Sequence, residues 1–573
     1  MERLRQGHPN ARPPALVGRH RVPGTVARLR RLPGGCVAVD RPDVIIVGAG
    51  GGGPVVAKGL AERGVRVLML EAGPWLDPDR DSTRLDDDMG GIVDGRLRWG
   101  PSDRSKAPWM RRRDGAGLIL QAAGVGGTTL HYNGISVRAY PHAVDDSWPF
   151  TYDELVPYYE QVEEFLPVRL VDDLATKDAL FAAGCEKVGL VRKDVREVTE
   201  ELWRPCHNAI LPIAKMETGM DLAQADGCTM CGHCLAGCPN PAGQPLERKA
   251  KRATNVSYVP AAMATGNCEI VPDAFATAVL FDAASGADGR AAVRGVRWRD
   301  ERTGDLQEAE ARVVVLAGGS VESPRLWLNS GLPNSNDAVG RYFNNHLQDI
   351  VTGFFDRDVH PNVGQVTMAR ADFPGYGAVF VQGNGPQNVS IALAGAGKGF
   401  WDDSTDGEPW DTAGRFYGEE AVRRIREYHR TLSVLVCTDD EEHRDNRIVL
   451  GDDWPADEHG AVPKVVYHPT PKSKERQLWL ARKAAEILRA AGAREVHRTN
   501  FDPVLVTHLM STMRVGRDAA TSVASPSGEA HEVAGLYIGD CSAMPNGLGG
   551  PNPTLTGQAM AARTADQIFA ALA

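Results

Sequence analysis

Apolar and polar residues follow two different spacings along the chain, and each spacing predicts a different part of the fold. Near the start, the apolar run Val44–Val47 is followed by the helix-like segment 54–64, "PVVAKGLAERG", and by a second apolar run, 65–71, "VRVLMLE". Short runs that are apolar at nearly every position are typical of strands buried on both faces of a parallel sheet. The order strand, helix, strand therefore predicts a βαβ unit of an α/β fold.

The second half of the chain shows the other spacing. Apolar and polar residues alternate in 348–356 ("QDIVTGFFD"), 446–452 ("NRIVLGD") and 464–469 ("KVVYHP"), which predicts antiparallel strands. Segment 474–492 has apolar residues at helical spacing and is expected to cover the sheet that these strands form. We therefore expect an α+β substrate-binding domain with an antiparallel sheet over residues 351–499.

Length, charge and cysteine content exclude several classes of protein. The chain has 573 residues, too many for one compact core, so at least two domains are expected. Its net charge of −10 argues against a nucleic-acid partner. The basic leader 1–41 lacks the apolar core of a secretory signal and is expected to be mobile, and no stretch resembles a membrane span. Ten cysteines, four of them in one short run, suit the reducing cytoplasm.

The turn between the two N-terminal strands carries the first sign of chemistry. Gly48, Gly50 and Gly53 form the pattern G-x-G-x-x-G after the first strand, and Glu71 ends the second strand. The glycines permit a tight turn and let the helix N-terminus approach a pyrophosphate, while an acid at the end of the second strand bonds ribose hydroxyls. The segment is therefore predicted to bind a dinucleotide, which this motif alone leaves open between FAD and NAD.

Four further segments resemble signatures of the glucose–methanol–choline (GMC) family of FAD-dependent oxidoreductases, in a bacterial type with a ferredoxin-like cysteine run. They are 124–138 ("GVGGTTLHYNGISVR"), 147–165 ("SWPFTYDELVPYYEQVEEF"), 311–333 ("ARVVVLAGGSVESPRLWLNSGLP") and the C-terminal part that begins with "HLMSTMRVG" at 508–516. In the second of these segments, Thr151 and Glu154 predict a helix capping box. The likeness runs from about residue 43 to the C-terminus and is weakest between residues 350 and 500.

This resemblance implies FAD as the cofactor and a Rossmann-like FAD-binding domain that is discontinuous in sequence. Its three parts are expected at 42–165, 240–350 and 500–573, with a cysteine-rich region at 166–239 and the substrate-binding domain at 351–499. Strands from distant segments are then expected to meet in one doubly wound sheet.

The resemblance also assigns the catalytic residues. Oxidation of an alcohol requires a base that accepts the hydroxyl proton while hydride leaves the same carbon. His508 matches the family's catalytic histidine, and Asn552 matches the position of its partner. His346, in "GRYFNNHLQ", is open to two interpretations, a residue that supports the active site or a purely structural one.

The residues expected to hold FAD come from all three parts of its domain. Asp540 is expected near the ribityl chain, as the acid is in relatives. His131 stands at the spacing from Gly127 at which some relatives bond a histidine covalently to the flavin; the alternative is a histidine that only stacks or hydrogen-bonds there. The full cofactor set is Gly48, Gly50, Gly53, Glu71, Gly126, Gly127, His131, Asn133, Asp540 and Pro553.

A run of cysteines, 228–239 ("CTMCGHCLAGCP"), predicts a metal site. Cys228, Cys231, Cys234 and Cys238 have the gaps of two, two and three residues that ferredoxins use for iron–sulfur clusters. A structural zinc site usually pairs two C-x-x-C knuckles a dozen or more residues apart, so one tight loop favours the cluster. Zinc, or a loop of free thiols, is the alternative.

These observations predict an FAD-dependent enzyme that oxidises a CH–OH group of a sugar-like, polyhydroxylated substrate to an aldehyde or ketone, with His508 as the base. Acidic stretches at 401–411 and 437–445 favour a cationic amino-sugar of the aminoglycoside type. The alternative is the catalytic subunit of a sugar, sterol or long-chain alcohol dehydrogenase that passes electrons through an iron–sulfur cluster to a partner. The expected acceptor is accordingly oxygen or an electron-transfer partner.

Overall fold

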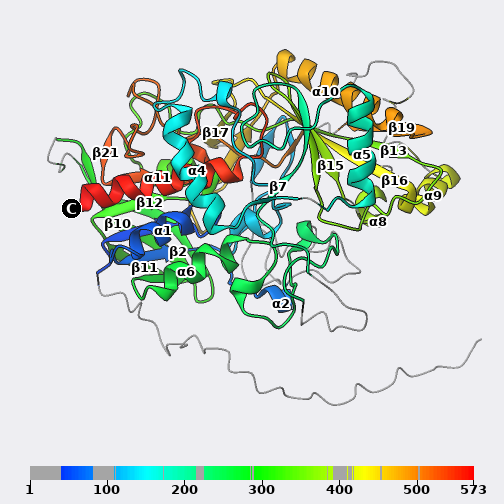
Figure 1. The fold of residues 1–573 in the computed structure, drawn as a ribbon. Coiled ribbons are helices and arrows are strands. Elements are labelled where there is room, and N and C mark those ends of the chain that lie inside the picture. The colour runs from blue at the N-terminus through cyan, green and yellow to red at the C-terminus, as the bar shows by residue number, and fades with distance from the viewer. Residues whose placement is uncertain are drawn as a thin grey trace, which may run out of the picture. The chain divides into compact units, whose positions relative to one another are not determined.

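A parallel sheet gathers strands from the beginning, middle and end of the chain (Figure 1). Its strand order is β22 (Leu536–Ile538), β12 (Val313–Leu316), β1 (Val44–Val47), β2 (Val67–Leu70) and β8 (Cys268–Val271). In the central strand β1, Val44 pairs with Val313 on one side and with Val67 on the other. All residues of β2 and β12 are buried, as their apolar runs predict. This computed structural model therefore confirms the α/β, Rossmann-like fold class.

The chain divides into residues 1–40 and residues 41–573, and the described residues all lie in the second unit. The structure describes residues 41–81, 109, 111–171, 173–214, 225–283, 286, 289–383, 385–390, 410, 416, 418–451, 454–500 and 504–573. The predicted leader lies outside the described residues except for Arg41.

Helices cover the parallel sheet and connect its strands. Helix α1 (Gly53–Ala61) joins β1 to β2 and contacts α6 (Tyr258–Ala264) and α11 (Thr554–Leu572). Helix α4 (Tyr152–Phe165) packs on α11, and α7 (Gly319–Asn329) follows β12. The capping box predicted at the start of α4 is confirmed: the Thr151 N–H donates to Glu154 Oε2 at 2.7 Å, and the Glu154 N–H donates to Thr151 Oγ1 at 3.3 Å.

A six-stranded antiparallel sheet forms the other large layer. Its strand order is β19 (Glu495–Asn500), β13 (Gln348–Phe354), β16 (Thr431–Thr438), β15 (Gly377–Gln382), β14 (Ala369–Phe373) and β6 (Leu202–Pro205). The helix predicted at 474–492 is confirmed as α10 (Pro471–Ala490), and it contacts β13 and β16. Helix α5 (Thr176–Lys187) packs beside α10 and against β14.

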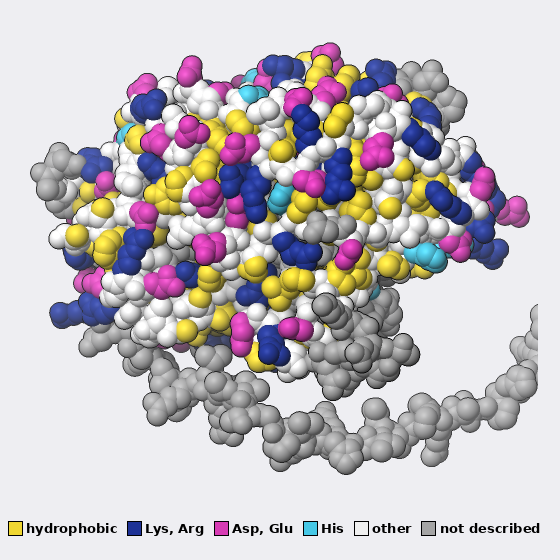
Figure 2. Space-filling view, viewed as in Figure 1, with side chains coloured by type: hydrophobic (Ala, Val, Ile, Leu, Met, Phe, Trp, Pro, Cys, Tyr) yellow, Lys and Arg dark blue, Asp and Glu magenta, His cyan; other side chains and the backbone are white. Residues whose placement is uncertain are grey.

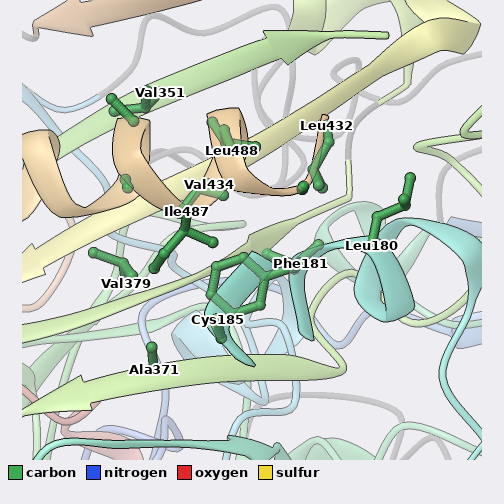
Figure 3. Packing of buried hydrophobic residues seen from close by; sticks show 14 of the residues in the cluster. Leu180, Phe181, Cys185, Val351, Ala371, Val379, Leu432, Val434, Ile487 and Leu488 are labelled. Atoms are coloured by element: carbon green, nitrogen blue, oxygen red, sulfur yellow. The ribbon is translucent and has the colours of Figure 1, made fainter. Parts of the chain in front are cut away.

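The core of this layer lies between the two helices and the sheet (Figure 3). Phe181 of α5 and Ile487 of α10 point toward Val379 and Val434 on the strands, and all four are fully buried. The two helices approach so closely that a Cβ on Gly184 would lie 2.4 Å from the Ile487 carbonyl oxygen. Glycine in α5 therefore permits the helix contact on which this core depends.

Two predicted strands join a different sheet from the one expected. The stretches 446–452 and 464–469 form β17 (Arg447–Leu450) and β18 (Pro463–Val466), which pair antiparallel with each other. Strand β18 also pairs with β3 (Arg112–Asp114), so these strands form a separate three-stranded sheet. Of the three predicted strands, only 348–356 contributes to the six-stranded sheet, as β13. Alternation predicts a half-buried strand but carries no information about its partner.

The remaining elements are short or lie at the edges of these layers. They are α2 (Pro78–Asp81), β4 (Ala116–Ile119), β5 (Arg169–Leu170), β7 (His207–Asn208), β9 (Ala274–Asp282), β10 (Ala291–Asp300), β11 (Leu306–Glu310), α8 (Pro386–Ser390), α9 (Gly418–Arg426), β20 (Val504–Val506) and β21 (Val533–Ala534), besides several 3-10 turns. Strands β9, β11 and β21 all pair with β10. None of the helices in the described ranges has the length and apolarity needed to cross a membrane.

A buried ion-pair cluster ties the β17–β18 loop to the parallel-sheet half. His459 Nε2 lies 2.7 Å from Glu301 Oε1, with the His459 side chain 0% and the Glu301 side chain 4% exposed. Asp457 in turn accepts a hydrogen bond of 3.2 Å from Arg325 Nη2 on α7. Burial opposes protonation of His459, but Asp457 and Glu301 outweigh it and raise the pKa of His459 above its ordinary value.

Replacing His459 by Gln should therefore destabilise the protein in a pH-dependent way. A raised histidine pKa contributes its full stabilisation below the unfolded pKa of about 6.5 and loses it as the pH rises through the folded value. We expect a loss of up to about 3 kcal/mol near pH 6, because a buried carboxylate loses its partner, and a smaller loss at pH 9. Thermal unfolding of both proteins at one scan rate measures the difference, and an unchanged difference across this pH range would contradict the ion pair.

Candidate active site

The glycine turn between β1 and α1 is closed by its own backbone. Gly48 has a φ of +108°, and a Cβ on Gly53 would lie 2.0 Å from the Gly48 carbonyl oxygen. Both positions therefore require glycine. A Cβ on Gly50 would meet only the Cα of Gly127 among the described residues, at 3.8 Å. The turn thus leaves space beside Gly50, where the motif predicts a pyrophosphate.

Glu71, at the end of β2, holds three backbone segments together. Its carboxylate accepts the N–H groups of Ala49 at 2.9 Å, Gly73 at 3.0 Å and Gly124 at 2.9 Å. Burial raises the pKa of Glu71 to about 7, while these three hydrogen bonds act in the opposite direction. Glu71 therefore connects the first glycine segment to the second, a role beyond the predicted contact with ribose.

The second glycine segment packs directly on the first. The Gly126 N–H donates to the Ala49 carbonyl oxygen at 2.8 Å, and a Cβ on Gly127 would lie 2.6 Å from the Gly50 Cα. The 3-10 turn Gly127–Leu130 is followed by His131, which caps its C-terminal end. Burial, and then the charge of Lys251, lowers the pKa of His131 to about 4, so this imidazole is neutral at physiological pH.

The predicted C-terminal cofactor residues lie against α7 and at the start of α11. Asp540, the second residue after β22, accepts hydrogen bonds from the Gly319 N–H and from Ser323 Oγ, both at 2.8 Å. It also accepts the Ser542 N–H at 2.7 Å. Pro553 is the residue that caps the N-terminus of α11. The structure therefore places the predicted segments from all three parts of the chain around the parallel sheet.

Buried polar atoms in these segments fit a bound cofactor. His131 Nδ1, Asn133 Oδ1 and Asn552 Oδ1 are buried and have no hydrogen-bond partner within the described part of the chain. The other end of the Asn133 side chain donates to Gln382 Oε1 at 3.2 Å, which links this segment to β15. Unsatisfied buried polar atoms are rare in folded proteins, so atoms of this kind are available to FAD. Which of them FAD contacts stays a prediction.

The predicted catalytic pair lies together, and His346 joins it. Asn552 Nδ2 is 3.1 Å from His508 Nε2, and His346 Nδ1 is 2.9 Å from His508 Nδ1. Asn345 Oδ1 accepts the backbone N–H groups of Thr507 and His508, both at 3.1 Å, and so fixes the loop after β20. His346 is therefore part of the site, which its sequence position alone did not establish.

Both histidines are held neutral by their surroundings. Burial lowers the pKa of His346 to about 4. Burial, followed by His346 and Arg370, lowers the pKa of His508 well below its ordinary value. A neutral imidazole has one free nitrogen lone pair, which is what a proton-accepting base requires.

A buried group of charges with net positive sign lies close enough to act on this pair. Arg204 Nε and Arg370 Nε each donate to Asp372 at 2.8 Å, and the Tyr140 hydroxyl donates to it at 2.7 Å. Burial opposes ionisation of Asp372, but the two guanidinium groups lower the pKa of Asp372 to about 2. Because two guanidinium groups share one carboxylate, the group keeps a net positive charge. Arg370 therefore disfavours protonation of His508. Arg370 and Asp372 lie on the same face of β14. Every residue of this strand is buried, so its sequence shows no alternation of polar and apolar residues from which the buried charges could be predicted.

The four cysteines of 228–239 form a loop in which each sulfur has an N–H donor. The Met230 N–H lies 3.4 Å from Cys228 Sγ, and Asn240 Nδ2 lies 3.4 Å from Cys231 Sγ. Backbone N–H groups of Val366 and Lys251 hydrogen-bond to Cys234 and Cys238, respectively. All four cysteines are described, and no three of their sulfur atoms lie within 4.8 Å of one another. Sulfurs on one tetrahedral zinc would be about 3.8 Å apart, so the loop is not arranged for a single zinc ion.

Lys251 joins the cysteine loop to the segment around His131. Its ammonium group donates to the carbonyl oxygens of Leu130 and Cys234 at 2.8 and 2.5 Å and to that of Tyr132 at 3.2 Å. Leu130 and Tyr132 flank His131, so one buried cation spans the predicted flavin segment and the predicted metal loop.

The acidic run 437–445 is largely engaged in internal contacts. Its ion pairs are Asp439 with Arg476 at 3.4 Å, Glu441 with Lys472 at 3.5 Å and Asp445 with Arg341 at 3.5 Å. Acidic and basic side chains are also intermixed on the face shown in Figure 2. The other acidic stretch, 401–411, lies outside the described residues except for Trp410. The described charges therefore give no separate support for attraction of a cationic substrate.

Fold and site together define an oxidoreductase that uses FAD to oxidise alcohols. The N-terminal model of the GMC oxidoreductase family matches residues 198–348, and the C-terminal model matches residues 442–561. The chain belongs to the GMC oxidoreductase family.

Similar proteins of known name agree with this assignment. The chain is 28% identical to 6'''-hydroxyparomomycin C oxidase of Streptomyces lividus, over 100% of this chain and 99% of the relative. It is 25% identical to 2-methyl-1,2-propanediol dehydrogenase of Mycolicibacterium austroafricanum, over 93% and 96%. It is 26% identical to paromamine 6'-oxidase of Streptomyces fradiae, over 92% and 91%. A solved formate oxidase of Aspergillus oryzae, studied for its FAD modification, shares the fold with a TM-score of 0.64 at 14% identity, over 94% of this chain and 99% of that one.

Two glycine variants separate cofactor binding from folding. Gly50→Val should give folded protein without FAD, because the new side chain enters the space predicted for the pyrophosphate. Gly52→Val should fail to fold, because its Cβ would lie 2.1 Å from the Gly539 carbonyl oxygen. Circular dichroism reports folding, and the flavin absorbance of the purified protein reports FAD. A yellow, active Gly50→Val protein would show that the cofactor lies elsewhere.

Proposed function

We propose that this enzyme oxidises a CH–OH group of an amino-sugar of the aminoglycoside type to an aldehyde or ketone, with His508 as the base. The observation that carries the proposal is the half-buried His508, whose lowered pKa keeps it neutral, with Asn552 Nδ2 at 3.1 Å from its Nε2. When bound, FAD would supply the acceptor for the two electrons that the oxidation releases.

The chain's own residues would act on the hydroxyl group. Without substrate, the Asn552 amide N–H occupies the lone pair of His508 Nε2. An incoming hydroxyl would replace the amide, donate its hydrogen to Nε2 and accept a hydrogen bond from Asn552. The hydroxyl proton then passes to Nε2, while Asn552 orients the oxygen that loses it.

The choice of an amino-sugar rests on the relatives. Two proteins that match along nearly their whole length are named for the oxidation of 6'''-hydroxyparomomycin C and of paromamine. A third is named for a small diol, so hydroxylated molecules without amino groups are the competing class. We also propose that the enzyme is located in the cytoplasm and meets such a substrate there.

Substrate and base can be tested in one anaerobic experiment. We expect amino-sugars to bleach the flavin faster than neutral sugars, small diols, sterols or fatty alcohols. His508→Ala should keep FAD and slow this reduction by about 10²–10⁴-fold, the usual contribution of a positioned base. Asn552→Ala should slow it less, because Asn552 orients the hydroxyl and takes no proton. Reduction of the His508→Ala protein at the wild-type rate would remove His508 from the mechanism.

A second proposal concerns the route of the electrons. We infer that Cys228, Cys231, Cys234 and Cys238 hold an iron–sulfur cluster that gives the enzyme an acceptor other than oxygen. The ferredoxin-like spacing, an N–H donor on every sulfur and the nearby ammonium of Lys251 support an anionic thiolate cluster. The dehydrogenase among the relatives is compatible with such an acceptor.

Metal analysis of two cysteine variants tests the cluster. Protein purified without oxygen should contain iron and acid-labile sulfide, and Cys231→Ser should lose both while keeping FAD. Cys185→Ala is the control, because Cys185 lies in the core between α5 and the six-stranded sheet and should leave the iron content unchanged. Stoichiometric zinc, or full turnover of a metal-free protein, would make the loop structural.

A further inference from the structure

A chain of hydrogen bonds runs from a backbone carbonyl to the proposed base. His346 Nε2 lies 2.7 Å from the Gly547 carbonyl oxygen, and His346 Nδ1 lies 2.9 Å from His508 Nδ1. His508 Nε2 then faces Asn552 Nδ2 at 3.1 Å. In each of these contacts, one atom must carry the hydrogen and the other must accept it.

The carbonyl decides where every hydrogen of this chain lies. A carbonyl oxygen only accepts, so His346 Nε2 carries a hydrogen, and the Nδ1 of a neutral His346 is a lone pair. The contact between the two Nδ1 atoms then requires a hydrogen on His508 Nδ1. A neutral His508 has its free lone pair at Nε2, which agrees with the Asn552 amide as donor at that nitrogen. The opposite tautomer of His508 would leave two lone pairs facing each other at 2.9 Å.

We propose that His346 is a positioning residue: it fixes His508 in the tautomer that carries hydrogen on Nδ1 and presents Nε2 as the base. This inference rests on the proposed function of His508. In the proton transfer, the O–H bond of the alcohol breaks, its proton bonds to the Nε2 lone pair, and His508 becomes an imidazolium. Its Nδ1–H stays hydrogen-bonded to His346 Nδ1, and this bond strengthens because the donor is now charged.

The partner of the base is thus a neutral imidazole and not a carboxylate. A carboxylate in this place would stabilise the charged form of His508 in the absence of substrate. His346 passes its own hydrogen to an uncharged carbonyl, so it orients His508 without bringing a negative charge to it. The arrangement keeps the base unprotonated until an alcohol arrives.

Two other interpretations of this cluster are less consistent with its distances. Cys437 Sγ lies 3.3 Å from His346 Nδ1, but its weak S–H donor also has the Gly550 carbonyl oxygen at 3.4 Å. His346, Cys437 and His508 offer ligand atoms close enough for a metal ion. Nitrogens on one tetrahedral zinc, however, would be about 3.4 Å apart, farther than the 2.9 Å between the two Nδ1 atoms.

Two substitutions of His346 separate positioning from packing. His346→Gln keeps an oxygen that can accept the His508 Nδ1–H and an amide that can donate to Gly547, whereas His346→Leu keeps neither. In the FAD-loaded enzyme we expect flavin reduction to fall by about 10²-fold or more in His346→Leu and by less than about 10-fold in His346→Gln. His459→Gln is the matched control: it removes a buried histidine elsewhere and should leave this rate unchanged. Equal rates in both His346 variants would overturn the proposal.

Nitrogen NMR of histidine-labelled, FAD-loaded enzyme tests the tautomer without turnover. The chain has 15 histidines, and the spectrum of His508→Ala identifies the signals of His508. We expect hydrogen on Nδ1 of His508 in the wild type and in His346→Gln, and a mixture of tautomers in His346→Leu. Hydrogen on Nε2 in the wild type, or stoichiometric metal that is lost in His346→Leu, would overturn the inference even if that variant does not fold. Because no substrate is needed, this result is independent of whether the proposed substrate is correct.

Discussion

The position of β1 between β2 and β12 is the constraint on which the cofactor site depends. Parallel strands end at the same edge of a sheet, so whatever follows neighbouring strands is brought together there. The glycine turn follows β1, Glu71 ends β2, the Gly318–Gly319 turn follows β12, and Asp540 follows β22. Segments about 500 residues apart thus share one edge because four short apolar strands pair in one register. Hydrogen bonds from backbone N–H groups to Glu71 and Asp540 then connect these turns to one another.

Backbone groups, more than opposite charges, stabilise the ionisable residues around the site. Glu71 is held by three N–H groups, Lys251 by three carbonyl oxygens and His346 by the Gly547 carbonyl. A backbone dipole satisfies a buried polar group without adding a full charge to the site. The exception is Asp372 with its two arginines, whose net charge is positive. The charge of Arg370 in this group acts together with burial and favours the neutral form of His508.

The sequence predicted the elements that depend on local patterns. The G-x-G-x-x-G turn, the capping box of α4 and the helix α10 all follow from residues close together in the chain, and the fold class and family followed from motifs in the right order. The partners of β17 and β18 could not be predicted, because alternation is the same whichever strand lies beside it. The place of strand β6 in the sheet could not be predicted for a related reason. It lies in the region 166–239, which was set apart because of its cysteines, yet it pairs with β14. The domain boundaries themselves stay predictions.

The site shows the same division between local and long-range information. His508 and Asn552 were predicted because each lies in a recognisable motif, whereas the proximity of His346 and Arg370 to them depends on segments far away in sequence. The acidic run 437–445 also depends on distant segments, since three of its charges are paired with Arg476, Lys472 and Arg341. Charge in a sequence predicts an electrostatic field only where folding leaves it unpaired.

Lys251 connects the cysteine loop, the proposed electron acceptor, to the segment around His131. Burial lowers the pKa of Lys251 to about 8, and the ammonium donates only to carbonyl oxygens, with no carboxylate acceptor, within the described part of the chain. Its position favours negative charge both at the cysteine loop and at the segment around His131. Its hydrogen bonds also hold these two segments next to each other. A cluster of thiolates would balance that charge, whereas four neutral thiols would not. The same cation would therefore stabilise negative charge on either side, at the cysteine loop and at the segment around His131.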